Sequence, residues 1–194
     1  MRSSTPPRDR LIAGTIDLVR RRGVAGTGIT ELVTYSNTAR RSIYQNFPRG
    51  KQQLIEESTR VAGQAMTAII AATAPAGGPS ARLAAFVRMW RKTLIASDFT
   101  AGCPIVAAAL AGADVPAAPG IAAESFAEWE TLIAELLSDA GVDRAAAETL
   151  ATVTVAAVEG AVVMSIAARS VSPLDRVAAH LDALLAPHLP GEAR

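Results

Sequence analysis

Side chains suited to nucleic-acid binding are concentrated in one short stretch of the chain, between residues 38 and 51. Arginine, lysine, serine, threonine and tyrosine donate hydrogen bonds to phosphate oxygens, and arginine and glutamine also reach base edges in the major groove. The side chains expected to contact DNA are Thr27, Thr38, Arg40, Arg41, Ser42, Tyr44, Gln45 and Lys51. These residue types therefore predict a surface for double-stranded DNA.

Two short helices joined by a tight turn, over about residues 28–47, would present these donors. Asn37 lies in the turn, where we expect a left-handed backbone that asparagine tolerates better than most residues. Thr27 is placed to cap the first helix and Thr38 the second. The helix from Arg8 to Arg22 supplies an apolar face on which both can pack. Their own apolar residues are Ile29, Leu32, Val33, Ile43 and Phe47. The pattern predicts a helix-turn-helix.

Charge is divided unevenly along the chain. Residues 1–60 carry 11 Lys/Arg against 5 Asp/Glu, a net of +6, whereas residues 61–194 carry 8 against 13, a net of −5. A basic surface is the electrostatic requirement for binding phosphates. We therefore expect a DNA-binding domain in residues 1–50 and a second domain in residues 51–194.

The composition favours an all-α fold. Half of the 194 residues are hydrophobic, alanine is abundant, and alanine is the strongest helix former. No segment alternates apolar and polar residues as a half-buried strand would. Breakers and caps predict about nine helices, over about residues 8–22, 28–35, 38–46, 51–72, 80–97, 104–111, 121–139, 144–170 and 172–186.

The most apolar run, from Ala151 to Ala168, has 18 residues. A membrane span needs roughly 20 largely apolar residues, so we interpret the run as a buried helix and expect no membrane partner.

Neither the histidines nor the cysteine suggests catalysis. His180 and His188 lie near the C-terminal end, far in sequence from the single cysteine, Cys103. The sequence contains no evident nucleophile pair, metal-ligand cluster or glycine-rich phosphate loop. We expect no enzymatic activity, metal or cofactor. One cysteine cannot form an internal disulfide and fits a reducing compartment, so we expect a cytoplasmic protein.

The sequence resembles the TetR family of bacterial transcriptional regulators over nearly its whole length. The resemblance begins with the run Ser42–Pro48 followed by Lys51 and Leu54. The spacing from Phe47 to Leu54, one residue longer than usual, resembles the LmrA/YxaF-like branch. Further motifs typical of that branch are Gly102-Cys103-Pro104-Ile105, Val158-Glu159-Gly160-Ala161 and Ser172-Pro173-Leu174. The family's usual turn glycine is replaced here by Asn37.

The resemblance implies an N-terminal three-helix DNA-binding domain and a C-terminal helical domain for effector binding and dimerisation. It further implies a homodimeric repressor that a small hydrophobic effector releases from a near-palindromic operator, with a drug-efflux or detoxification gene as target. Candidate effector-binding residues are Met66, Ile70, Phe86, Met89, Trp90, Phe126, Trp129, Thr152, Val155 and Glu159. Each of these is also compatible with ordinary core packing.

The implied dimer would form through the last two long helices. Their apolar stripes contain Leu150, Val153, Ala156, Val163, Leu174, Val177, Leu181 and Leu184.

Two alternatives stay open from the sequence. One is a small-molecule carrier or sensor whose DNA-binding domain is vestigial, and the other is a non-specific DNA binder. The basic N-terminal third and its intact donor set favour the repressor.

Overall fold

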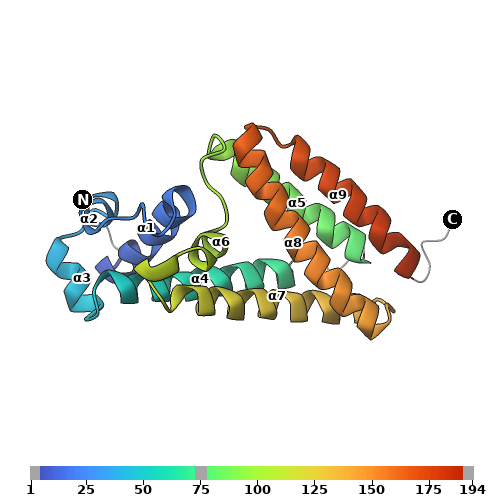
Figure 1. The fold of residues 1–194 in the computed structure, drawn as a ribbon, viewed down its shortest axis with the longest axis horizontal. Helices are drawn as coiled ribbons and strands as arrows, with labels where there is room; N and C mark the ends of the chain where they lie inside the picture. Colours follow the sequence, from blue (N-terminus) through green and yellow to red (C-terminus); the bar gives the residue numbers. More distant parts are fainter. Residues whose placement is uncertain (1–4, 73–77, 190–194) are drawn as a thin grey trace. The chain divides into compact units, whose positions relative to one another are not determined.

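A computed structural model describes residues 5–72 and 78–189, and every regular element in these residues is helical (Figure 1). Nine α-helices and two short 3₁₀ helices occur in this described part. The prediction of an all-α fold with nine helices is confirmed. The chain divides into an N-terminal unit, residues 1–65 with 103–125, and a C-terminal unit, residues 66–102 with 126–194.

The N-terminal unit consists of α1 (Pro7–Arg22), α2 (Ile29–Tyr35), α3 (Arg40–Asn46), the first part of α4 (Lys51–Ala72), α6 (Pro104–Ala109), η1 (Gly112–Asp114) and the start of α7 (Ala118–Asp139). An apolar core holds α1, α2, α3 and the first part of α4 together. The buried core residues are Leu11, Ile12, Leu18, Leu32, Ile43, Phe47 and Leu54. Ile16, Ile29 and Val33 pack against them. The predicted seating of α2 and α3 on α1 is therefore confirmed.

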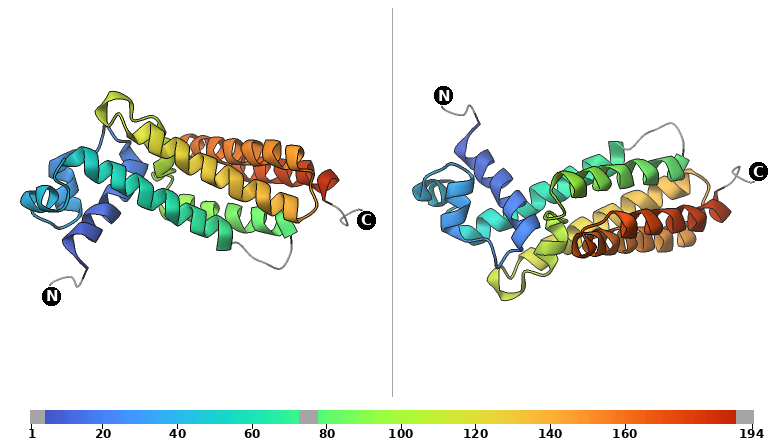
Figure 2. Two further views of the ribbon diagram at one scale, coloured as in Figure 1. Left: turned by 90° about the horizontal axis from the view of Figure 1, so that it is seen from below. Right: turned by 90° about the horizontal axis from the view of Figure 1, so that it is seen from above.

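The C-terminal unit contains three helices that lie side by side: α5 (Gly78–Ala96), α8 (Arg144–Ala168) and α9 (Ser172–Leu185) (Figures 1 and 2). The rest of α4 and of α7 also belong to it, and η2 (Ala186–His188) follows α9. The Asp143 carboxylate caps α8 by accepting from the amides of Ala145 at 3.1 Å and Ala146 at 3.3 Å. Gly141 follows α7 with a φ of 93°, in the region that favours glycine.

Two helices begin earlier than the sequence predicts. Helix α5 begins at Gly78, two residues before its predicted start, and α7 begins at Ala118, three residues before. The prediction treated Pro79 and Pro119 as breakers. A proline in the first turn lacks only an amide that would have no helical partner there, so it starts a helix as readily as it stops one.

Helix α8 is long and apolar enough to cross a membrane when judged by length and composition alone. A packed core helix has the same properties. In this structure one side of α8 packs on α5 and α9, which buries Ala151, Val158 and Val162.

The apolar stripes of α8 and α9 do not form a single face. Leu150, Leu174 and Leu181 are buried within the chain, so the expectation that they lie at a surface between two copies is wrong. They pack inward because α8 and α9 pack on each other and on α5. By contrast, Val153 is 39% exposed and Val163 is 53% exposed.

Candidate functional site

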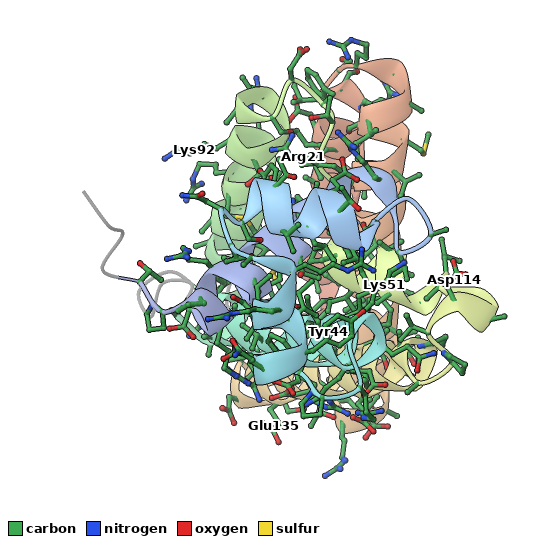
Figure 3. The ribbon with its side chains drawn as sticks, turned by 90° about the vertical axis from the view of Figure 1, so that its left-hand side faces the viewer. Arg21, Tyr44, Lys51, Lys92, Asp114 and Glu135 are labelled. Carbon is green, nitrogen blue, oxygen red and sulfur yellow. The ribbon has the colours of Figure 1, made fainter. Side chains whose placement is uncertain are left out.

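Helix α3 is anchored by one apolar residue and exposes its polar side chains. Ile43 is fully buried, whereas Arg40, Arg41 and Gln45 are exposed and Tyr44 is 48% exposed. Figure 3 looks onto α2 and α3, with Tyr44 labelled. The exposed set combines guanidinium, amide and phenol donors on one short helix, which suits phosphate and base-edge contacts.

The predicted caps of α2 and α3 are wrong. Gly28 is the N-cap residue of α2 and Ala39 that of α3, and neither helix has a side-chain cap. Thr27 is fully buried, and its hydroxyl donates to the Gly23 carbonyl at 2.8 Å. Thr38 precedes the N-cap residue, and its hydroxyl oxygen is buried. Both threonines therefore contribute to the interior of the turns.

The arginines of the N-terminal unit differ in whether they already have a partner. Four of them form ion pairs within the unit: Arg8 with Glu57, Arg21 with Asp17, Arg22 with Glu31 and Arg49 with Glu56. Arg40 and Arg41 have no hydrogen bond or ion pair to any residue that the structure describes. The cations of α3 are thus available to an external anion.

Arg49 is a residue that the sequence analysis did not single out. Its Nη1 and Nη2 donate to Glu56 Oε1 and Oε2 at 3.2 and 2.7 Å, and its backbone amide donates to Gln53 Oε1 at 3.0 Å. The Glu56 side chain is only 7% exposed. This bidentate pair fixes the loop between α3 and α4. The pair spans a loop and two helical turns, so sequence spacing alone gave no signal for it.

Tyr44, on α3, and Lys51, at the start of α4, also have contacts within the N-terminal unit. The Tyr44 ring lies over Gly50, where an added Cβ would be 3.2 Å from Tyr44 Cε1. Gly50 has a φ of 66°, a conformation that favours glycine. Lys51 begins α4, is half-buried, and its Nζ lies 3.4 Å from the Val24 carbonyl oxygen. Tyr44 and Lys51 are both labelled in Figure 3.

A carboxylate on α1 fixes the end of α2. Asp17 Oδ2 accepts from Arg21 Nε at 2.8 Å and from the Tyr35 hydroxyl. Burial alone would raise the pKa of Asp17, but these hydrogen bonds and the charges of Arg21 and Arg20 outweigh it and leave the pKa below its ordinary value. The same hydrogen bond to Asp17 raises the pKa of Tyr35. The network connects α1 to the last residue of α2.

The C-terminal unit encloses a cavity of about 90 Å³ with mostly apolar walls. Five of the ten predicted effector-binding residues line it: Ile70, Phe86, Trp129, Val155 and Glu159. Further lining residues that the sequence analysis did not identify include Leu83, Ile133, Leu136, Leu137, Val158 and Leu185. Two described lining residues carry charge, Arg82 and Glu159.

The other five predicted residues lie away from this cavity. Trp90 is buried in the core, and Phe126 packs edge-on against Trp129 with ring centroids 5.3 Å apart. Met66 and Met89 are half-buried, and Thr152 lies in a polar groove between α7 and α8. All ten residues, which were chosen from the family resemblance, lie on helices that contribute to the cavity walls, but the rotation of each helix decides which residues reach the cavity.

Comparisons with known proteins agree with this arrangement. Residues 79–180 match the family model described as "Transcriptional regulator LmrA/YxaF-like, C-terminal domain". An uncharacterised HTH-type transcriptional regulator of Mycobacterium tuberculosis is 34% identical, over 97% of this chain and 98% of that protein. The HTH-type transcriptional regulator LmrA of Bacillus subtilis is 25% identical, over 92% of this chain and 96% of its own.

Solved structures share the fold at lower sequence identity. A TetR regulatory protein from Rhodobacter sphaeroides superposes with a TM-score of 0.83 at 17% identity, covering 92% of this chain and 98% of that one. A TetR transcriptional regulator from Legionella pneumophila superposes with a TM-score of 0.82 at 17% identity, covering 95% of this chain and 99% of that one.

Proposed function

This chain belongs to the TetR family of transcriptional regulators, in its LmrA/YxaF-like branch, and from that premise we propose that it is a ligand-responsive repressor. In this proposal it binds a near-palindromic operator as a homodimer in the cytoplasm and releases the DNA when a small apolar effector binds. The observation that carries the proposal is the set of exposed donors on α3, whose arginines have no partner in the part of the chain that the structure describes.

The proposed DNA contacts follow from the exposure of each side chain. Arg40, Arg41 and Gln45 are the candidates for base edges and phosphates in the major groove. Tyr44, Ser42 and Lys51 are assigned to phosphates. Because the hydroxyls of Thr27 and Thr38 are buried, we leave those two residues out of the proposed contact set.

The dimer is proposed to form through the exposed apolar face of α8. Val153, Val163 and Met164 are exposed there, and Met164 is 56% exposed. A Cβ added at Gly160, on the same helix, would meet no atom within 4 Å, so this position leaves room for a second helix to approach closely. A twofold axis at this face would present two α3 helices to half-sites about 34 Å apart, or a multiple of that spacing, and the operator would be near-palindromic.

The cavity supports the effector part of the proposal through its chemistry and its size. Its walls are aromatic and aliphatic, which suits a hydrophobic ligand. Its volume of about 90 Å³ is well below the roughly 300–1,000 Å³ typical of ligand pockets. An effector of ordinary size must therefore displace the walls, one of which is Ile70 of α4. Ligand binding would thus favour a different conformation from the DNA-competent one, as release by a population shift requires.

Footprinting on DNA upstream of the protein's own gene and its neighbours tests the proposal. A repressor protects one or more near-palindromic segments at nanomolar to micromolar protein. Protection without sequence preference would support a non-specific DNA binder. No protection, together with binding of hydrophobic compounds, would support the carrier with a vestigial DNA-binding domain. The resemblance to the LmrA/YxaF-like branch supports a drug-efflux or detoxification gene as the target.

A further inference from the structure

Arg10, in the first turns of α1, connects the beginning of that helix to the turn between α2 and α3. Its Nε donates to the Ser36 carbonyl at 3.2 Å and its Nη2 to the Asn37 carbonyl at 3.1 Å. Its Nη1 donates to the Thr5 carbonyl at 2.9 Å. All three nitrogens of one guanidinium are therefore used by backbone carbonyls. Two of these carbonyls lie 26 and 27 residues away in the sequence.

The C-terminal end of α2 is a favourable place for such a cationic donor. The last carbonyls of a helix have no partner within the helix, and they carry a partial negative charge that a cation stabilises. The last turn of α2 contains no basic residue, so this charge is not balanced within the helix. A guanidinium has a planar fork that can serve two neighbouring carbonyls, which an ammonium group cannot reproduce.

The turn that follows is held in an unfavourable backbone conformation. Asn37 has a φ of 47°, in the left-handed region. This conformation costs a non-glycine residue roughly 1–2 kcal/mol. The backbone amides of Asn37 and Thr38 donate to the Thr34 and Val33 carbonyls at 3.2 and 3.0 Å. Arg10 adds two side-chain hydrogen bonds to this turn.

We propose that Arg10 is a positioning residue, which holds the α2–α3 turn in its left-handed conformation and so orients α3 for operator binding. This inference rests on the proposed function, because it assigns Arg10 a role in DNA binding without contact to DNA. It also explains how asparagine can occupy position 37, where the family usually has a glycine. The bonds from Arg10 compensate for conformational freedom that glycine would have provided.

The alternative role for Arg10 is a direct phosphate contact, and salt dependence distinguishes the two. Loss of a phosphate contact lowers the slope of log affinity against log salt by about 0.9 for each charge removed. Loss of a positioning residue weakens binding to the operator and leaves that slope unchanged. It also reduces the ratio of operator binding to binding of unrelated DNA.

The test is a double-mutant cycle of Arg10→Ala with Asn37→Gly, measured by fluorescence anisotropy on the footprinted operator at several salt concentrations. Arg10→Ala is expected to lower operator affinity about tenfold, or about 1.4 kcal/mol. With Asn37→Gly present, where the turn no longer strains the backbone, the loss is expected to fall to about threefold or less. Arg10→Lys should resemble Arg10→Ala, because it keeps the charge but loses the fork. Equal losses in both backgrounds would overturn the proposal, as would wild-type affinity in Arg10→Lys.

Arg22→Ala is the matched control, since Arg22 also lies on α1 and contacts α2, through Glu31 and away from the turn. It should retain operator affinity. Hydrogen exchange of the peptide covering residues 33–43 tests the inference without DNA. Exchange should be faster in Arg10→Ala than in the wild-type protein or Arg22→Ala, with thermal unfolding by circular dichroism showing a folded variant. Unchanged exchange would overturn the inference. Absence of operator binding by the wild-type protein would instead refute the proposed function.

Discussion

Gly14 lies where α1 passes closest to the end of α2, and its replacement by alanine gives a sharp test of that packing. A Cβ at Gly14 would lie 2.3 Å from Ser36 Oγ, whereas its distances to Ser36 Cβ and Tyr35 Cδ1 would both be an ordinary 3.4 Å. The clash is thus confined to one oxygen atom. That oxygen is buried and has no hydrogen-bond partner among the described residues.

The magnitude follows from two opposing effects. Alanine in a helix interior is favoured over glycine by about 1 kcal/mol, whereas overpacking a buried site typically costs about 1–3 kcal/mol. Gly14→Ala alone should therefore lower the free energy of unfolding by up to about 2 kcal/mol. In a Ser36→Ala background the clashing oxygen is absent, and the same change should raise the free energy of unfolding by about 1 kcal/mol. The sign of the effect depends on one atom.

Urea unfolding followed by circular dichroism, at one fixed protein concentration, measures the stability of the wild-type protein, Gly14→Ala, Ser36→Ala and the double variant. Ser36→Ala alone should be neutral or slightly stabilising, because it removes a buried hydroxyl that lacks a partner. Operator affinity should follow the same pattern, since Ser36 immediately precedes the turn. A Gly14→Ala effect that is equal in both backgrounds would refute the close approach of α1 to Ser36.

Four further outcomes are expected. Arg40→Ala should weaken operator binding by about 1–3 kcal/mol in fluorescence anisotropy, and unchanged affinity at every salt concentration would remove α3 from the interface. Val163→Asp should give folded monomers in analytical ultracentrifugation, because Val163 is exposed within one chain, and a clean dimer would place the interface elsewhere. Hydrophobic antibiotics, dyes or plant phenolics that release operator DNA should quench the fluorescence of Trp129, which lines the cavity. This quenching should persist in Trp90→Phe and be lost in Trp129→Phe. The lowered pKa of Asp17 stabilises the fold at pH values above the unfolded pKa of about 3.9, and this contribution is lost as pH falls through the folded pKa. Asp17→Asn should therefore be less stable than the wild-type protein at pH 7 but not at pH 2. An equal difference in stability at both pH values would refute the assignment.

Local signals in the sequence were sufficient to place the helix-turn-helix. Apolar spacing seats α2 and α3 on α1, and the left-handed turn at Asn37 is confirmed by its φ of 47°. Asp143 caps α8, the helix predicted over about residues 144–170. These features depend on residues within a few positions of one another or on helical periodicity, which a single sequence displays directly.

Features that depend on how the helices pack against one another could not be predicted from the sequence. Arg10 finds its partners 26 and 27 residues away, only because α1 passes beside the end of α2. Thr27 has the residue type of a cap but donates to a carbonyl instead, because it is enclosed by the core. Leu181 has the same pattern as an interface residue, and only the packing of α9 shows that it faces inward.

The proposed function requires a chain that is both stable and switchable, and the arginine partners and the cavity are compatible with these two requirements. The ion pairs of Arg49 and the Asp17 network fix the frame around α3, which keeps its exposed donors in a defined arrangement. The small cavity, in contrast, is the place where, in the proposed function, the walls move when a ligand binds. A ligand shifts an equilibrium only by the difference in its affinity for the two states, and a cavity too small for the ligand in one state supplies that difference. Filling the cavity by substitution, for example Val155→Phe, should therefore lower effector affinity and leave operator binding in the absence of effector unchanged.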